Sequence, residues 1–577
     1  MELTTYQKQI LNYFKEYPSN NLYVNAKAGC GKSFIAAQML KDVENNSVYL
    51  AFNKSIAEEM KAKLNNPKVK VYTMHGLCNS ILNYNLNNER ENSSNAKRAI
   101  GINRGTPSSE GQLDYYKIYK IIDDLLYRDS EARKNFEYKT FLKENYVKLY
   151  NLIRLKVINL EDVAHAKKNL ALTIMEQNLF FHDKFETPSI EEVLPFCRQI
   201  HNKSLELFND RKIYDFTDML YITYIKLCEG EWSVPYWHLY SNVVNDELQD
   251  YSTIQLYLLR FFKRKNGRFV FILDPNQAIY LFSGANSSSF KLVKSLYAPV
   301  KEFQLPINYR CATSHLEYVN RLHNIGIKPC PTAPIGTIER INKNTALELI
   351  EAGDYLIGRK NKWLLPMILE LIKRGKPVYI KDEAFVKAIK KVVEDFNFNS
   401  IIELESKIKN KEQQLRNKLE EKKRKEQEAQ KKDFVDKDED IEGNETEEIE
   451  AQEVTIEEEV EDNSGQTEIL DVIKRLLYSF KEQYTTNSKN QFLKYIDSIL
   501  NTTKSENCIF VSSIHCVKGL EAENVFVLNE GKPVIDKFMS REQRQQEYNL
   551  SYVALTRAKE NLYLVKAEGE EYGKSGH

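Results

Sequence analysis

The chain has 577 residues, of which 42% are hydrophobic, and its 82 Lys and Arg balance 82 Asp and Glu. This length suits about three to five domains, and no stretch approaches the roughly 18 uninterrupted apolar residues of a membrane span. The eight Cys are scattered without a C-x-x-C pair, which argues against a zinc ribbon, an iron–sulfur cluster or a disulfide framework. Because the N-terminus also lacks a signal-peptide pattern, we expect an intracellular, cytoplasmic protein with reduced thiols.

The zero net charge is the sum of two unlike regions. Residues 433–462 hold sixteen acidic residues and one Lys, so the rest of the chain carries an excess of fifteen positive charges. A basic body of this kind favours a polyanionic partner. The acidic tract is too charged to bury a core, so we predict a disordered, solvated loop there; the alternative is a tract that mimics DNA or binds a partner protein.

Several short apolar segments are typical of buried strands in parallel sheets. In chain order they lie at 22–26, 47–52, 242–246, 268–274, 354–359 and 508–513, and each stands immediately before a polar signature. Ligands of open α/β folds bind at the carboxyl ends of parallel strands. The polar signatures should therefore meet in one crevice.

Two stretches interrupt this α/β pattern. Residues 85–210 repeat apolar residues every three or four positions and predict a nearly all-helical segment, in which the Lys/Tyr interleaving at 115–150 favours an amphipathic helix over a nucleic-acid face. Residues 381–499 predict a short helical arm rather than an extended coiled coil, because roughly heptad spacing covers barely three heptads. The heptad positions are Ile401, Leu404, Ile408, Leu415 and Leu419.

The segment AKAGCGKS at 26–33 follows the first predicted strand and opens a predicted helix. Gly29 and Gly31 allow backbone N–H groups to turn toward phosphate oxygens, Lys32 can reach the β and γ phosphates, and Ser33 can hold Mg²⁺. The alternative is a glycine-rich helix cap, since Ala26 stands where the general motif has Gly. A partner motif elsewhere decides between the two.

That partner is Asp246-Glu247, an acid pair that ends the apolar strand at 242–246. Asp246 can bind Mg²⁺ directly or through water, and Glu247 can polarise the water that attacks the γ-phosphorus. An acid pair alone is usually the solvated start of a loop. Downstream of a phosphate-binding loop it is interpreted as a hydrolytic pair.

Further signatures follow in a fixed order. They are TTYQ at 4–7, AFNK at 51–54, TMHG at 73–76, IYDFTDML at 213–220, DELQD at 246–250, LDPNQAIYLFSGA at 273–285, NYR at 308–310, RKN at 359–361, SIHCVKGLE at 513–521 and YVALTRAK at 552–559. Together they resemble the motifs of UvrD/Rep-type superfamily 1 DNA helicases from Leu3 to about Val565. The AFNK form is more similar to the corresponding motif of F-box DNA helicases and some phage-defence helicases than to that of the main repair enzymes. Leu273 and Ser283 depart from the third motif, which usually starts with Gly-Asp and has Arg before Gly-Ala.

The resemblance implies an α/β fold with two RecA-like P-loop domains and a helical insertion in each. Domain 1A would comprise residues 1–84 and 211–300, with 85–210 inserted as 1B. Domain 2A would comprise residues 301–380 and 500–577. Residues 381–499 would form a reduced 2B-like insertion with the charged arm and the acidic loop.

The resemblance also implies roles for individual residues at an ATP site between the two domains. Gln277 would sense the γ-phosphate, and Arg310 and Arg557 would stabilise transition-state charge from the second domain; a surface ion pair is the alternative for either Arg. Catalysis would use Lys32, Asp246, Glu247, Gln277, Arg310 and Arg557, with Ser33 and Asp246 as Mg²⁺ ligands. Tyr309 would stack on adenine, Gln7 would hydrogen-bond it and Glu521 would hold the ribose. The full set of nucleotide contacts would be Gln7, Ala28, Gly29, Cys30, Gly31, Lys32, Ser33, Tyr309 and Glu521.

Single-stranded DNA should cross both domains, because stacking on aromatic side chains tolerates any base. The implied contacts are Phe52, Asn53, Thr73, His75, Tyr280, Phe282, Arg359, Asn361 and His515. The three aromatic side chains could instead belong to the core, and either His could be a satisfied loop residue.

These features predict an ATP-driven 3′ to 5′ translocase that unwinds duplexes at single-strand junctions, in repair, recombination or antiphage defence. A second hypothesis is a DNA-sensing ATPase switch that regulates a partner nuclease without processive unwinding. A scaffold with a dead ATPase is disfavoured because every hydrolytic position is filled.

Overall fold

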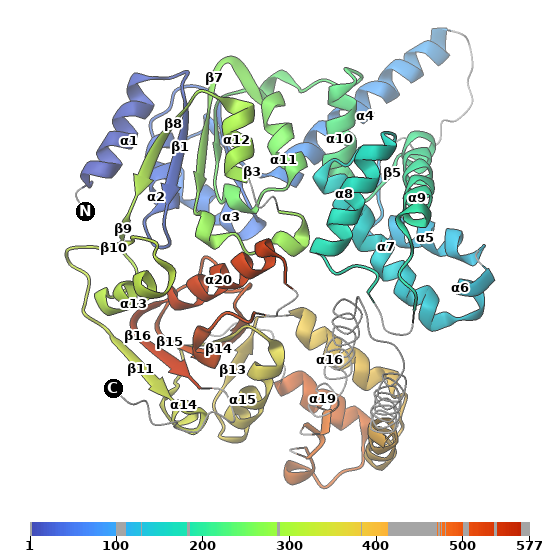
Figure 1. Cartoon of the computed structure of the whole chain (residues 1–577), viewed down its shortest axis with the longest axis vertical. Coiled ribbons are helices and arrows are strands. Elements are labelled where there is room, and N and C mark those ends of the chain that lie inside the picture. The colour runs from blue at the N-terminus through green and yellow to red at the C-terminus, as the bar shows by residue number, and fades with distance from the viewer. Residues whose placement is uncertain are drawn as a thin grey trace, which may run out of the picture.

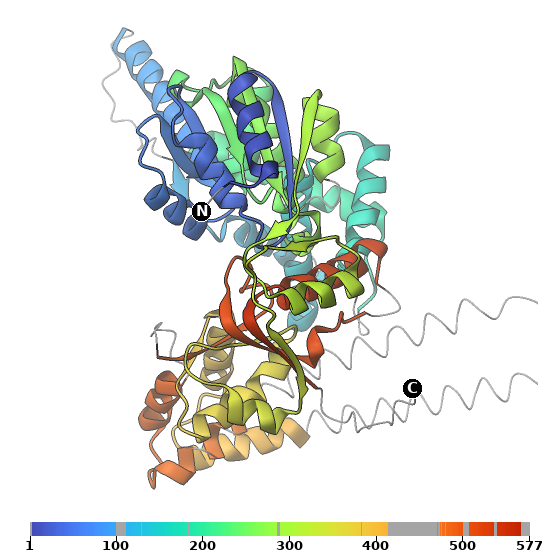
Figure 2. The ribbon, with the colours of Figure 1, turned by 90° about the vertical axis from the view of Figure 1, so that its left-hand side faces the viewer.

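The computed structural model describes residues 3–99, 111–128, 130–181, 185–285, 289–381, 383–413, 507–535 and 539–566, and most of 470–499. It contains two six-stranded sheets, and every strand pairing that joins their members is parallel. This confirms the predicted α/β class with two RecA-like domains. Figure 2 shows the two lobes one above the other.

The first sheet has the order β3-β2-β6-β7-β1-β8. The inner strands β1, β2, β6 and the second half of β7 are mostly buried because helices cover both faces, whereas the edge strands β3 and β8 are partly exposed. The strands are β1 (Asn21–Ala26), β2 (Ser47–Ala51), β3 (Val69–Thr73), β6 (Tyr240–Asn245), β7 (Lys263–Leu273) and β8 (Val300–Leu305). The flanking helices are α1 (Thr5–Glu16), α2 (Lys32–Leu40), α3 (Lys54–Lys63), α4 (Met74–Ala99), α10 (Asp218–Cys228), α11 (Thr253–Leu258) and α12 (Ser289–Tyr297). Because β8 pairs with β1, it belongs to the first sheet. The domain boundary predicted after residue 300 therefore cuts this strand, and residues 301–305 lie in the first sheet rather than in the second.

The second sheet has the order β11-β16-β15-β12-β14-β13. Its strands are β11 (Thr337–Ile341), β12 (Tyr355–Gly358), β13 (Val378–Ile380), β14 (Ile509–Ser513), β15 (Ala522–Leu528) and β16 (Ala558–Val565). Its helices are α13 (Thr313–His323), α14 (Lys343–Leu349), α15 (Asn361–Lys373) and α20 (Arg541–Leu555). A short pair, β9 (Ile307–Asn308) with β10 (Lys328–Pro329), follows the connection between the lobes. In Figure 1 α20 lies at the edge of the lower lobe that faces the first sheet.

The first insertion is helical and has its own apolar core. It consists of α5 (Lys117–Tyr127), α6 (Ser130–Lys134), α7 (Phe136–Lys156), α8 (Val163–Glu176) and α9 (Ile190–Arg211), and the pair β4 (Gln112–Leu113) with β5 (Ile213–Tyr214) closes its base. A buried ion network joins it to the first lobe: Arg154 of α7 and Lys117 of α5 both pair with Asp218 of α10, and Arg154 also pairs with Asp215.

The second insertion shares a core with the second sheet. Its described helices are α16 (Glu383–Asp395), a helix at 401–413, helical residues within 470–483, and α19 (Lys489–Ile499). Ile401, Leu404 and Ile408 are buried in one cluster with Phe480 and Phe492 and with residues of α15 and β14. The heptad positions Leu415 and Leu419 and the acidic tract 433–462 lie outside the described residues. Within the described part of the chain, no helix is both long enough and apolar enough to span a bilayer.

Candidate active site

The phosphate-binding loop joins β1 to α2 and depends on two left-handed glycines. Gly29 has φ +65° and Gly31 has φ +81°, a region that other L-residues rarely adopt. A Cβ at Gly29 would lie 2.5 Å from Asn308 Nδ2 and 2.9 Å from Arg310 Cβ, so this glycine also permits close approach of the second lobe. Gly31 leaves the N-terminus of α2 without a side-chain cap. The backbone N–H groups at the N-terminus of α2 can therefore bind an anion.

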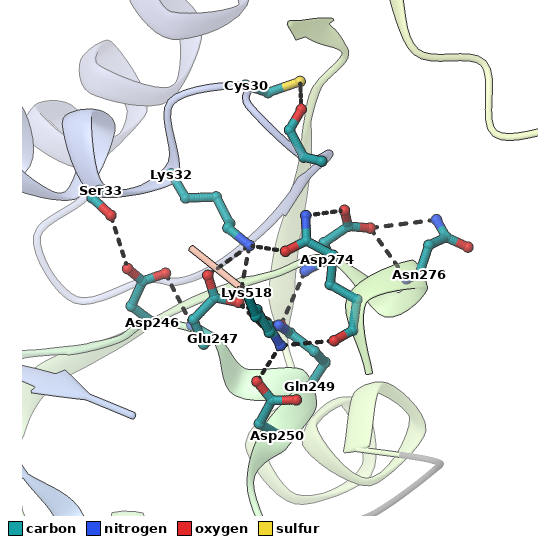
Figure 3. A network of polar contacts seen from close by, with 12 residues as sticks. Cys30, Lys32, Ser33, Asp246, Glu247, Gln249, Asp250, Asp274, Asn276 and Lys518 are labelled. Atoms are coloured by element: carbon teal, nitrogen blue, oxygen red, sulfur yellow. Dashed lines mark hydrogen bonds and ion pairs between the residues drawn. The ribbon is translucent and has the colours of Figure 1, made fainter. Parts of the chain in front are cut away.

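The first-lobe side chains of the site lie at the carboxyl ends of β1 and β6 (Figure 3). Lys32 Nζ lies 2.8 Å from Glu247 Oε1. Ser33 Oγ donates to Asp246 Oδ2 at 3.4 Å, and the Tyr49 hydroxyl donates to the same oxygen at 2.5 Å. The structure thus brings together the four polar residues that the two sequence motifs predicted.

Gln277 and Asp274 extend this network from the carboxyl end of β7. Gln277 Oε1 accepts from Lys32 Nζ at 3.5 Å, and its Nε2 donates to Asp274 Oδ2 at 3.0 Å. The Tyr552 hydroxyl of α20 donates to Asp274 at 3.1 Å and accepts the Ala28 N–H at 2.9 Å. Sequence reasoning assigned no role to Asp274 or Tyr552, although both lie inside motifs that it identified.

Lys518 also crosses from the second lobe to the first. It donates to the Asp250 carboxylate and, at 2.7 Å, to the Gln277 carbonyl oxygen, and its Nζ lies 3.8 Å from Glu247 Oε2. Burial would raise the pKa of Glu247, but the charges of Lys32 and Lys518 outweigh it and lower that pKa to about 2. Burial raises the pKa of Asp250 to about 6 despite the Lys518 contact. Glu247 is therefore ionised at neutral pH and held between two ammonium groups.

The two arginines of the second lobe have different surroundings. Arg310 Nε donates to Glu521 Oε2 at 2.5 Å, and its Nη1 contacts the Thr556 carbonyl oxygen at 3.4 Å. Arg557 is 1% exposed. Its guanidinium donates to the Val553 and Leu520 carbonyl oxygens at 2.8 and 3.1 Å. Burial, reinforced by Arg310, lowers the pKa of Arg557 to about 9. Arg310 lies beside Gly29 of the phosphate-binding loop. Arg557, in contrast, is held by carbonyl oxygens of its own lobe.

The two residues predicted to contact adenine lie next to the phosphate-binding loop. Gln7 is buried in a capping box with Thr4 at the start of α1, and its Nε2 would lie 3.9 Å from a Cβ placed on Gly31. The Tyr309 N–H donates to the Gly29 carbonyl oxygen at 2.9 Å. Gln7 and Tyr309 thus approach the phosphate-binding loop from two different lobes.

The donor set fits Mg²⁺, since the Ser33 hydroxyl and the Asp246 carboxylate are hard oxygen ligands that already share a contact. Among the described residues, no cluster of three or more His, Cys, Asp or Glu could hold a metal ion. Cys30 is buried and donates to the Ala28 carbonyl oxygen at 3.6 Å, and burial raises the pKa of its thiol. It contributes backbone geometry to the loop rather than a thiolate ligand.

A groove of about 770 Å³ lies beside this site on the first lobe. Its lining includes Phe52, Asn53, Thr73, His75 and Phe216. The His75 and Phe216 rings stack with centroids 4.0 Å apart, and burial lowers the pKa of His75 to about 4. Phe216 lies within the motif at 213–220, but that motif alone predicts no role for this residue.

The remaining predicted strand contacts lie near the lobe junction or in the second lobe. The Phe52 and Tyr280 rings stack at 5.2 Å, and the Tyr280 hydroxyl donates to the His515 carbonyl oxygen at 3.1 Å. Arg359 forms a bidentate pair with Glu547 at 2.7 and 3.0 Å, which occupies its guanidinium inside the second lobe. Asn361 begins α15. The side chain of Phe282 lies outside the described residues.

Comparison with models of known protein families assigns these motifs to one family. A model of the UvrD/REP helicase N-terminal domain matches residues 3–298, more than half of the chain, and a model of the UvrD-like helicase C-terminal domain matches residues 509–565. The chain belongs to the UvrD/Rep helicase family. The matched ranges include β1, β6 and β7 of the first lobe and α20 of the second.

Individual members of the UvrD/Rep family are distant relatives. F-box DNA helicase protein 1 of Schizosaccharomyces pombe is 24% identical over 97% of this chain, but the match covers only 57% of that protein. A probable DNA helicase II homolog of Mycoplasma genitalium is 23% identical over 94% of this chain and 82% of its own length. ATP-dependent DNA helicase Rep of Buchnera aphidicola is 28% identical over 24% of this chain and 21% of its own length.

Proposed function

We propose that this UvrD/Rep family protein is an ATP-dependent DNA helicase that translocates on single-stranded DNA, with the 3′ to 5′ polarity that the resemblance implies. The observation that carries the proposal is the meeting of Lys32, Glu247 and Lys518 between two parallel-sheet lobes. Phosphate-binding and hydrolytic groups of one lobe there contact a side chain of the other. A nucleotide bound at this junction would change how the lobes meet.

The proposed chemistry follows from these contacts. Lys32 and the N–H groups at the start of α2 bind the phosphates, and Ser33 and Asp246 would hold Mg²⁺, which neutralises phosphate charge when bound. Lys32 exchanges its contact with Glu247 for the nucleotide, leaving that carboxylate to orient and deprotonate the attacking water. Arg310 supplies transition-state stabilisation from the second lobe, and Arg557 does so after release from its carbonyl partners.

The groove beside Phe52, His75 and Phe216 suits the proposed strand, because it combines aromatic faces with polar side chains. The positive charge of the chain outside 433–462 supports a polyanionic substrate. Single-stranded DNA and its junctions with duplex are the substrates we propose.

A strand-displacement assay tests this function. Purified full-length protein, Mg²⁺ and ATP are mixed with duplexes that carry a 3′ tail, a 5′ tail or no tail, and ATP hydrolysis is followed in parallel. The proposal expects DNA-stimulated hydrolysis and ATP-dependent displacement of the 3′-tailed duplex. Hydrolysis without displacement of any duplex would contradict the helicase function.

A second candidate function is a DNA-sensing ATPase that regulates a partner nuclease in defence, or a partner protein in repair. Two observations favour it: the second insertion shares the core of the second sheet, and Ser283 replaces the usual motif Arg. DNA-stimulated hydrolysis without displacement, together with ATP-dependent activation of a co-purified nuclease, would support this candidate.

A further inference from the structure

The turn after Gln277 is held by residues of two other modules. Leu281 donates its backbone N–H to Gln546 Oε1 of α20 at 3.0 Å, and its carbonyl oxygen accepts from Gln177 Nε2 at 3.3 Å. Gln177 directly follows α8 of the first insertion. A third glutamine, Gln543 of α20, donates to the Glu176 carbonyl oxygen at 3.0 Å and closes the triangle between the modules.

The α20 residues that hold this turn recur every three positions. Gln546 contacts Leu281, Asn549 Nδ2 donates to the Ala278 carbonyl oxygen at 2.8 Å, and the Tyr552 hydroxyl reaches Asp274. Residues three apart lie on the same face of a helix. One face of α20 therefore follows the segment from Asp274 to Leu281, which contains the proposed γ-phosphate sensor Gln277 and the predicted strand contact Tyr280.

The presence of Ser283 increases the share of the contact between the lobes that the glutamines provide at this turn. Ser283 stands two residues after Leu281, where the resembled family usually has Arg, and its hydroxyl donates to the Tyr280 carbonyl oxygen of the same turn at 2.9 Å. Here neutral side-chain amides make the hydrogen bonds to Leu281, in addition to the contacts of Lys518 with Gln277 and of Tyr280 with His515. These amides surround a cavity of about 410 Å³, whose lining comes from the first lobe, the first insertion and the second lobe.

We propose that Gln546, Gln543 and Gln177 form a coupling clasp, which transmits movement of the second lobe to the turn carrying Tyr280. This inference rests on the proposed helicase function. The glutamines act as positioning residues: none of them is a proposed nucleotide or strand contact, but together they hold the turn that follows Gln277 and carries Tyr280. Loss of one bond should uncouple hydrolysis from strand movement without abolishing hydrolysis.

Each hydrogen bond of the clasp has a fixed donor and a fixed acceptor, and substitutions can test these roles. Leu281 presents an N–H to Gln546, so position 546 needs an acceptor, whereas the Glu176 carbonyl oxygen requires a donor at position 543. We expect Gln546→Glu to retain coupling and Gln546→Met to lose it. Gln543→Glu and Gln543→Met should both lose it. A role in packing alone would not distinguish the two positions in this way.

The measurement is the ratio of base pairs unwound to ATP hydrolysed, with DNA-free ATP turnover and melting temperature as checks. We expect this ratio to fall about tenfold in Gln546→Met while DNA-free turnover stays within about twofold of wild type. Gln491→Met, at an exposed glutamine of α19, is the matched control. Equal ratios in Gln546→Met and the control would overturn the clasp, as would equal losses in Gln546→Met and Gln546→Glu.

A second readout separates this inference from the proposed function. The affinity for a fluorescent oligonucleotide is measured with and without a non-hydrolysable ATP analogue, which needs no unwinding. If wild type binds the oligonucleotide but displaces no strand, the helicase proposal fails and the clasp is still tested. The clasp predicts that the nucleotide-dependent change in affinity shrinks in Gln546→Met and persists in Gln546→Glu; an unchanged effect in both variants would overturn it.

Discussion

Lys32 and Glu247 form an ion pair of 2.8 Å inside the candidate active site. The pair joins the residue that would bind the γ-phosphate to the residue that would activate water. Because Glu247 also lies 3.8 Å from Lys518, its charge is balanced by both lobes. Nucleotide binding must compete with these contacts, which links occupancy of the site to the contact between lobes.

Glu247→Gln should lower the maximal ATP hydrolysis rate by at least about 100-fold, because an amide cannot accept the proton of water. ATP affinity should stay the same or rise, since the phosphate-binding loop is unchanged and the ion pair that competes for Lys32 is lost. A coupled phosphate-release assay and nucleotide titration measure the two effects. Glu59→Gln, on the exposed surface of α3, is the control. Unchanged turnover in Glu247→Gln would show that another group activates the water.

Arg310→Ala should lower hydrolysis by about 10³-fold at saturating ATP, because its guanidinium would no longer stabilise charge on the transferred phosphoryl group. Arg310→Lys should recover little of this loss, since an ammonium cannot reproduce the planar fork. Arg340→Ala, at a side chain that is 55% exposed, is the control. A loss of ATP affinity with undiminished maximal rate would contradict the transition-state role.

Arg154→Met should destabilise the protein by about 3–5 kcal/mol, because it leaves the buried Asp215 and Asp218 without their shared partner. Lys63→Ala removes an exposed pair within α3 and should cost less than about 1 kcal/mol. Urea unfolding followed by circular dichroism measures both. Equal effects of the two substitutions would show that the buried network does not hold the insertion to the first lobe.

Phe216→Ala should weaken binding of single-stranded DNA by about 1–3 kcal/mol through loss of one stacking face. The dependence of affinity on salt should not change, because no phosphate contact is removed. Phe136→Ala, at an 84% exposed aromatic of α7 that is not part of the groove lining, is the control. Fluorescence anisotropy at several salt concentrations distinguishes a stacking loss from a change in charge.

His75 should make the protein less stable at acidic pH. Its pKa falls from 6.5 to about 4 on folding because of burial, so below pH 6.5 the unfolded chain binds the proton more readily. Stability attributable to this residue is complete above pH 6.5 and declines toward pH 4, by up to about 1.4 kcal/mol per unit. His75→Gln should flatten the decline in urea unfolding between pH 7 and 4.5, whereas substitution of the exposed His165 should not.

The sequence alone was sufficient for the family, the α/β class and the local parts of the site. Gly29, Gly31, Lys32 and Ser33 are nearly consecutive, and a strand–loop–helix segment of this kind prescribes its own geometry through backbone angles and helix-terminal N–H groups. The acid pair Asp246-Glu247 is equally local. Such motifs can be identified without knowing what surrounds them.

Only the tertiary structure decided which residues from distant segments contact these motifs. Lys518 and its partner Asp250 are 268 positions apart, and Gln546 and Leu281 are 265 apart. No sequence period links such pairs, because packing of the lobes and not chain geometry sets their distance. Packing of the lobes also decides that Arg310 lies beside Gly29, whereas the guanidinium of Arg557 is held by carbonyl oxygens of its own lobe. Composition and motif order predict the chemistry of this protein, while the pairing of its lobes determines how one site can influence another.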